Sequence, residues 1–93
     1  MTKFTLVYND EFLKSARKLP KFQKQKPAEL LELFQSNPFH PKLHTKHLTG
    51  KLSGFYSFRI TRDWRVIFKF LSIDTIQLIY VGHRKEIYKT LGR

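Results

Sequence analysis

Two arginines stand among apolar residues in segment 54–68, GFYSFRITRDWRVIF. Period-two alternation places the apolar side chains of this hairpin on one face and leaves Arg59 and Arg65 together on the other. A three-residue loop, Thr61 to Asp63, keeps the apolar rows on one side and sets Arg59 opposite Arg65. Because like charges at opposite positions cost stability, the pattern favours an anion held between them. A phosphate suits the planar, paired donors of arginine.

The alternative interpretation treats these arginines as solvated charges that keep an exposed sheet face soluble. Further along, the segment 81–88, VGHRKEIY, places Arg84 and Tyr88 on one face of a helix. Tyr88 suits base stacking or proton transfer, or else simple packing. Asp63 is either an ordinary turn residue or the group that orients a neighbouring arginine.

Three histidines have the spacings of four and three that some zinc sites show: His40, His44 and His47. Pro41 interrupts the helix that would align them, and Lys42 and Lys46 repel a cation. The chain has no cysteine, and no Asp or Glu lies nearby to complete a site. The sequence therefore predicts neither a metal nor another cofactor.

The side chains that remain available for catalysis are those of Arg, Lys, His and Tyr. These residue types suit RNA cleavage by the neighbouring 2′-hydroxyl. That reaction needs a base for the hydroxyl, cations for the charge on the phosphorane and an acid for the leaving 5′-oxygen. Histidine is well tuned for either proton step near neutral pH.

Composition supports a single domain over residues 1–93 with a strong attraction to polyanions. Lys and Arg number 18 against 7 Asp and Glu, a net charge of +11, and 41% of the residues are hydrophobic. Such an excess predicts binding to nucleic acid, a ribosome or an acidic protein. No segment has the pattern of a signal peptide or a membrane span, and the lack of cysteine fits the cytoplasm.

Hydrophobic patterning defines the elements that position these residues. Residues 3–8 alternate as a strand, and Asn9 is a helix cap, with Tyr8 and Leu13 as a hydrophobic staple. The buried stripe of this first helix, which ends near Pro20, is Phe12, Leu13, Ala16 and Leu19. A second helix ends at Asn37-Pro38 and either begins near Lys26 or kinks at Pro27, the kink being expected.

The second half of the chain reads as a loop followed by strands. Residues 37–52 form the loop, with a short extended piece at most. Strands are expected at 55–61, 64–71 and 75–81, and a short C-terminal helix at 84–91. The order βααβββα predicts an α+β fold: a four-stranded antiparallel sheet with two N-terminal helices on one face and the other face partly open.

The segments 48–68 and 81–88 resemble toxins of the RelE/ParE superfamily, and the resemblance extends over nearly the whole chain. It is greatest to the RelE, YoeB and YafQ branches. The resemblance implies the toxin of a type II toxin–antitoxin pair, a metal-independent endoribonuclease that cuts messenger RNA in the ribosomal A site.

Carried over by position, the resemblance assigns scissile-phosphate binding to Arg65. Arg59 stands where the YafQ-like branch has a histidine, and Asp63 matches an aspartate of that branch. Lys46, with His47 beside it, falls near the variable upstream catalytic position. The C-terminal catalytic position lands on His83 or Arg84, depending on a one-residue gap.

The resulting hypothesis gives each cation or proton donor a role. Arg59, Arg65 and Arg84 hold the phosphate, His83 is the acid, and Lys46 or His47 helps to activate the 2′-hydroxyl. Tyr88 matches the tyrosine that closes the RelE pattern and stacks or assists proton transfer. Further RNA contacts are assigned to Lys51, Arg62 and Lys85.

The expected partners are a cognate antitoxin, the ribosome and messenger RNA, with operator DNA an open alternative and no membrane. Two other hypotheses stand beside the ribonuclease: a ParE-like inhibitor of DNA gyrase and a non-catalytic nucleic-acid-binding module. The His83 to Tyr88 ending favours the RelE side.

Overall fold

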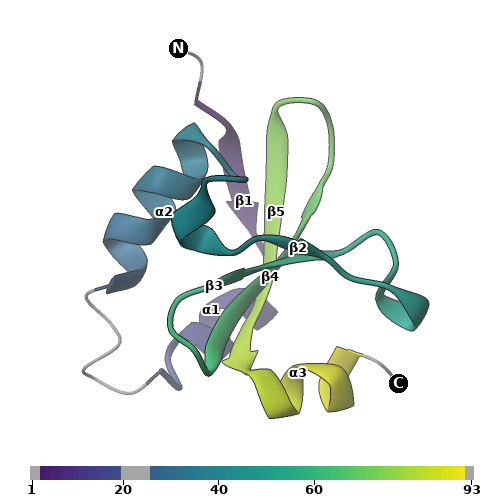
Figure 1. Cartoon of the computed structure of the whole chain (residues 1–93). Helices are drawn as coiled ribbons and strands as arrows, with labels where there is room; N and C mark the ends of the chain where they lie inside the picture. The colour runs from purple at the N-terminus through teal and green to yellow at the C-terminus, as the bar shows by residue number, and fades with distance from the viewer. Residues whose placement is uncertain (1–2, 20–25, 92–93) are drawn as a thin grey trace.

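A computed structural model of the chain describes residues 3–19 and 26–91. Within them, three α-helices and a five-stranded sheet make up the α+β fold (Figure 1). The strands are β1 (Thr5–Tyr8), β2 (Lys46–His47), β3 (Tyr56–Arg59), β4 (Trp64–Phe70) and β5 (Thr75–His83). The helices are α1 (Asp10–Ala16), α2 (Lys26–Ser36) and α3 (Arg84–Leu91), with short 3-10 helices η2 (Pro41–Leu43) and η3 (Gly50–Leu52).

The strand order is β1-β5-β4-β3-β2, and the sheet is mixed. Strands β2 to β5 are antiparallel to their neighbours, whereas β1 runs parallel to β5 with Thr5 opposite Thr75. The expectation of four antiparallel strands was therefore wrong in the number of strands, which is five among the described residues, and in the direction of β1, which is parallel to its neighbour. A short hairpin forces antiparallel pairing, but β1 and β5 are joined by a long connection, which allows them to pair in parallel. The two residues of β2 are too few to show a period.

The first helix begins as its sequence predicts. Asn9 Oδ1 accepts the Phe12 amide at 2.8 Å, which satisfies an orphan donor of the first turn. The expected staple does not form, because Tyr8 stacks on Phe12 with ring centroids 5.8 Å apart and Leu13 stays 43% exposed. Leu13 was thus wrongly assigned to the buried stripe, whereas Phe12 and Leu19 are buried.

Helix α2 begins at Lys26, so Pro27 stands in its first turn, where a missing amide costs no helical hydrogen bond. The expected kink requires helix at 21–25, which lies outside the described residues. The helix ends at Ser36, before the predicted Asn37-Pro38 stop. Its Phe34 stacks on Phe58 at 4.6 Å between ring centroids, burying the helix against the sheet.

Each face of the sheet carries its own apolar cluster. Helices α1 and α2 cover the face that holds Phe58, Val66 and Phe68, as expected from alternation. The opposite face holds a second cluster that the sequence did not predict, made of Leu48, Leu52, Ile67, Tyr80 and Ile87. Because Ile87 belongs to α3 and Leu52 to η3, these two elements cover part of the face that was expected to be partly open.

A register shift in β5 sets which of its residues face which cluster. Ile67 pairs with Tyr80 and Phe68 with Leu78, which leaves Ile79 without an opposite residue on β4. An extra residue of this kind reverses the alternation beyond it. Leu78 consequently lies in the helix-covered cluster and Tyr80 in the second one.

A buried serine joins α1 to β5. Ser15 is 3% exposed, and its hydroxyl accepts the Val81 amide at 2.9 Å while donating to the Phe12 carbonyl at 3.0 Å. β1 ends opposite Leu78, so β5 has no strand partner on that side at Val81. The Ser15 hydroxyl takes the place of the missing strand.

The turn between β4 and β5 is held by its own side chains. The Ser72 and Thr75 hydroxyls donate to the Asp74 carboxylate at 2.8 and 3.0 Å. These hydrogen bonds hold the pKa of Asp74 below its ordinary value of 3.8. Asp74 is therefore a stable negative charge at this end of the sheet at neutral pH.

Candidate nucleic-acid interface

Three neighbouring strands place an arginine pair beside a glycine. Arg59 of β3 lies opposite Arg65 of β4, as the three-residue loop predicts, and Arg65 lies opposite Gly82 of β5. The loop is closed by the Ile60 amide, which donates to the Trp64 carbonyl at 2.8 Å. Both guanidinium groups therefore share the face of the sheet that carries the second apolar cluster.

The Nε atoms of Arg59 and Arg65 are buried and have no hydrogen-bond partner among the described residues. Leaving a charged donor without a partner is costly. Two such donors from directly opposite residues form a position that an oxyanion with several acceptor oxygens satisfies. We call this pair, with Gly82 beside it, the arginine row.

Lys46 is the upstream candidate that shares the face of the arginine row. It pairs with Ser57, which stands two residues before Arg59 on β3 and is 2% exposed. His47 alternates to the other face, pairs with Tyr56 and packs on its ring at 4.8 Å between centroids. The structure thus brings Lys46, and not His47, to the face of the arginines.

Asp63 orients an arginine, and that arginine is Arg84. The Arg84 amide donates to the Asp63 carbonyl at 2.7 Å, and Nε lies 3.5 Å from Oδ1. The ion pair is half exposed, so it adds little to stability. It does fix where Arg84 begins α3, two residues after Gly82 of the arginine row.

His83 caps α3 and lies beside Trp64, away from the arginine row. Its ring meets the Trp64 ring edge-on at 5.7 Å between centroids, and Nδ1 accepts the Lys85 amide at 3.2 Å. Because Nδ1 is an acceptor, the neutral ring carries its proton on Nε2. His83 is the last residue of β5, so it stands at the end of that strand, opposite Trp64 of β4.

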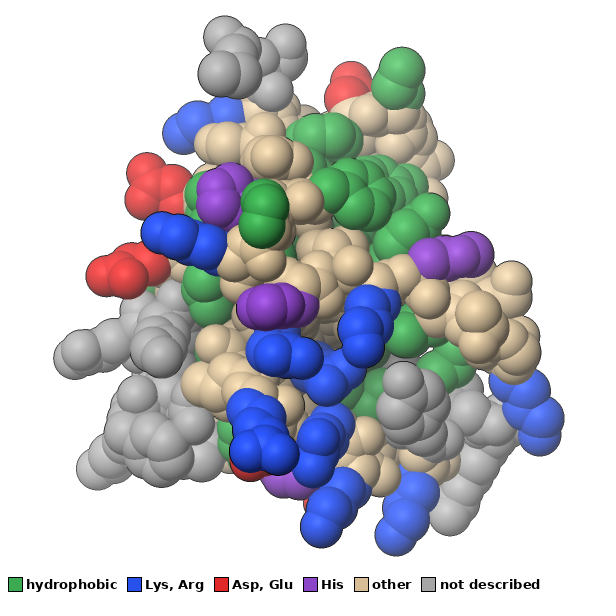
Figure 2. Space-filling view, in the orientation of Figure 1, with side chains coloured by type: hydrophobic (Ala, Val, Ile, Leu, Met, Phe, Trp, Pro, Cys, Tyr) green, Lys and Arg blue, Asp and Glu red, His purple; other side chains and the backbone are tan. Residues whose placement is uncertain are grey.

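The remaining cations are exposed around this face. Lys51 belongs to η3, Arg62 to the hairpin loop and Lys85 to the first turn of α3. Figure 2 shows Lys and Arg side chains gathered over the part of the molecule where β2, β3 and β4 meet α3. Tyr88 stands in α3, but its side chain lies outside the described part of the structure.

Sequence reasoning missed two residues that shape the site, Ser57 and Gly82. Ser57 shares the parity of Arg59, which was a usable signal. Gly82 lay just outside the strand expected at 75–81, and only the observed extension of β5 to His83 makes it a strand glycine, where close approach of another group is the usual reason. A Cβ at Gly82 would lie 2.5 Å from the Tyr80 ring, so glycine here lets that ring pack against α3.

The histidines of the loop have local structural roles. His40 Nδ1 accepts the Lys42 amide at 3.1 Å, and His44 ends η2 with a φ of 49°. Within residues 3–19 and 26–91, no three His, Cys, Asp or Glu side chains come together as a metal site. No helix of that part is long and apolar enough to cross a membrane.

A family model identifies the class of protein to which the chain belongs. The model of the family described as the ParE toxin of the type II toxin–antitoxin system, parDE, matches residues 6–88. The chain belongs to this family of toxins. No curated protein matches it significantly.

Solved structures show the same fold at low identity. The matching chain in the RelB–RelE antitoxin–toxin complex from Methanococcus jannaschii is 26% identical, with a TM-score of 0.73 over 90% of this chain and 96% of that one. The YoeB/ParE toxin from Agrobacterium tumefaciens is 19% identical, with a TM-score of 0.72 over 87% and 99%. The match in the E. coli DinJ–YafQ complex is 19% identical, with a TM-score of 0.74 over 92% and 98%.

Proposed function

We propose that this toxin is a ribosome-dependent endoribonuclease that cleaves messenger RNA by attack of the 2′-hydroxyl and is neutralised by a cognate antitoxin. The observation that carries the proposal is the arginine row, with two buried Nε donors on one face that have no hydrogen-bond partner among residues 3–19 and 26–91. A phosphodiester supplies the acceptor oxygens that these donors lack. Its site of action is the cytoplasm, where messages are translated.

The proposed reaction forms a bond between the 2′-oxygen and phosphorus and breaks the bond from phosphorus to the 5′-oxygen. Arg59 and Arg65 hold the non-bridging oxygens and stabilise the charge that develops on them. Lys46, on the same face, stabilises the 2′-alkoxide by its positive charge and so favours transfer of the 2′-hydroxyl proton to water. The products are a 2′,3′-cyclic phosphate and a free 5′-hydroxyl.

Two groups at the end of β5 are candidates for the remaining steps. To give the Nε2 proton to the leaving 5′-oxygen, His83 must first become an imidazolium, so Nδ1 takes up a proton and releases the hydrogen bond that it accepts from the Lys85 amide. His83 lies beside Trp64 and not beside the arginine row, so RNA must pass around the end of β5 to reach it. Arg84, held by Asp63, is the alternative cation at that end.

The test is primer extension on translated messages after induction of the chain. Wild type should give new cuts, and Arg65→Ala should reduce cleavage about 10²- to 10³-fold, the usual cost of losing one donor to a developing oxyanion. Arg17→Ala is the matched control, because it removes an exposed arginine at the end of α1. No cuts from the wild type, or equal cutting by both variants, would overturn the proposal.

Inhibition of DNA gyrase is the second candidate function, and the ParE description of the matching family favours it. It predicts DNA damage and filamentation with messages intact, whereas the ribonuclease stops translation first. Pulse labelling of protein and of DNA after induction separates them. A fall in DNA synthesis that precedes any fall in translation would support the gyrase hypothesis.

A further inference from the structure

The end of the sheet that carries the β4–β5 turn exposes a group of large apolar side chains. Phe39 is 58% exposed, Leu71 51% and Ile73 93%. Phe39 stacks on the partly buried Phe70 ring, Ile73 lines a cavity together with the partly buried Phe4, and Leu71 follows Phe70 in the chain. We call these five residues the apolar end patch. Contiguous apolar surface rarely faces solvent without a partner.

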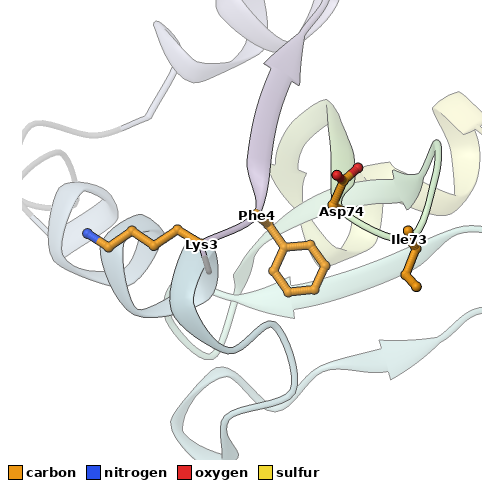
Figure 3. A pocket seen from close by; sticks show the side chains of 4 residues that line it. All are labelled: Lys3, Phe4, Ile73 and Asp74. Carbon is orange, nitrogen blue, oxygen red and sulfur yellow. The ribbon is translucent and has the colours of Figure 1, made fainter. Parts of the chain in front are cut away.

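The patch is preformed and has a hollow beside it. The Phe70 ring stacks on Phe39 and meets Phe4 edge-on, with both pairs of centroids 6.1 Å apart. A cavity of about 280 Å³ is lined by Lys3, Phe4, Ile73 and Asp74. Figure 3 shows the Phe4 ring extending toward the turn of Ile73, while the Lys3 side chain extends away from it.

The apolar end patch and the arginine row lie at opposite ends of β4. Arg65 is near the start of that strand and Leu71 follows its end, a separation of about 20 Å at the rise of a β-strand. Phe70 also belongs to the helix-covered face, opposite the face of Arg65. Figure 1 shows the β4–β5 turn at one end of the molecule and α3 at the other.

The chemistry of the patch fits a protein segment better than RNA. Phe39 offers an exposed ring, but the most exposed member, Ile73, and Leu71 are aliphatic and give a base nothing to stack on. Asp74 stands at the rim as a carboxylate that repels phosphates. Lys3 stands on the other side of the rim, where it suits a carboxylate of the partner.

We infer that the apolar end patch is an anchor for the antitoxin, which places a large apolar side chain in the cavity between Phe4 and Ile73. The inference rests on the proposed function for its partner, and matching toxin folds from Methanococcus jannaschii, Pyrococcus horikoshii and E. coli were solved with antitoxins. A chain of net charge +11 calls for an acidic partner. Apolar anchoring at one end and charge neutralisation at the other divide recognition between two surfaces.

The test uses the product of the reading frame next to this gene, expressed and purified as the binding probe. Its affinity is measured by biolayer interferometry for wild type, for the double variant Leu71→Ser with Ile73→Ser, and for Leu13→Ser. Leu13 is the matched control, since it is an exposed leucine on α1 outside the patch. The double variant should bind at least about tenfold more weakly, as expected for two apolar anchors, and Leu13→Ser should bind like the wild type.

Hydrogen exchange of the wild-type complex locates the contact without any variant. The amides of residues 71–75 should gain protection, and those of α1 should not. Equal affinities for the double variant and Leu13→Ser, no exchange protection in the turn, or no complex with the wild type would each overturn the anchor. Loss of message cleavage by the double variant would instead show that the patch binds RNA.

The anchor and the ribonuclease fail in different ways. If Arg65→Ala cleaves messages like the wild type while the double variant loses antitoxin affinity, the anchor stands and the catalytic proposal falls. If Arg65→Ala is inactive and the double variant binds the antitoxin normally, the reverse holds.

Discussion

At the scale of single residues, strand alternation predicts which charges meet only where pairing is regular. The opposition of Arg59 and Arg65 followed from alternation and loop length alone, and the structure confirms it. The choice between Lys46 and His47 did not follow, because a strand of two residues has no period of its own. The pairing of Lys46 with Ser57 of β3 shows that Lys46, and not His47, lies on the face of the arginines.

This difference predicts unequal effects of two substitutions in β2. Lys46→Met should lower message cleavage about 10²-fold, a cost typical of losing a group that assists proton transfer. His47→Gln should leave cleavage near the wild-type rate, since its ring packs on Tyr56 on the other face. Single-turnover cleavage of a ribosome-bound message checks both, and a larger loss for His47→Gln would contradict the assignment.

At the scale of elements, hairpin signals were reliable and the connections between distant elements were not. The β3–β4 hairpin and the span of α3 follow from alternation and spacing. The extra residue at Ile79 does not, and it reverses the facing of everything beyond it. His83 therefore lies beside Trp64, although its place in the sequence beside Arg84 suggested a shared site.

The tie between α1 and β5 predicts a stability effect far from the site. Ser15→Ala removes the acceptor of the buried Val81 amide and should lower the free energy of unfolding by about 1–3 kcal/mol. Ser36→Ala is the control, because its hydroxyl bonds the Glu32 carbonyl on an exposed helix surface, and its effect should stay within about 0.5 kcal/mol. Urea unfolding followed by circular dichroism measures both, and equal midpoints would contradict the tie.

At the scale of the whole molecule, composition predicts attraction to polyanions, which stays a prediction, and the structure shows where some of the charge gathers. The net charge of +11 predicts attraction to polyanions, whereas the fold shows one region where Lys and Arg side chains gather, over β2, β3, β4 and α3 (Figure 2). The apolar end patch was not predictable, because exposure of Ile73 depends on how the β4–β5 turn projects from the sheet.

Electrostatic binding on this face predicts a strong dependence on salt. With about four phosphate contacts, the logarithm of the binding constant for single-stranded RNA should fall with log salt at a slope of about −3. Arg65→Ala should reduce the steepness by about 0.7, the contribution of one contact. Fluorescence anisotropy at 50 to 300 mM KCl is the measurement, and a slope unchanged by Arg65→Ala would remove this residue from the RNA contacts.

The parallel pairing of β1 with β5 also determines when the sheet of this toxin can be completed during synthesis. β1 begins at Thr5, yet its partner begins at Thr75, and Gly82 of the arginine row is near the end of that same strand. Contacts so distant in sequence form late, because the long intervening loop must close first. The arginine row is therefore completed only after the chain through β5 has left the ribosome that makes it, so the earlier strands emerge without a formed site.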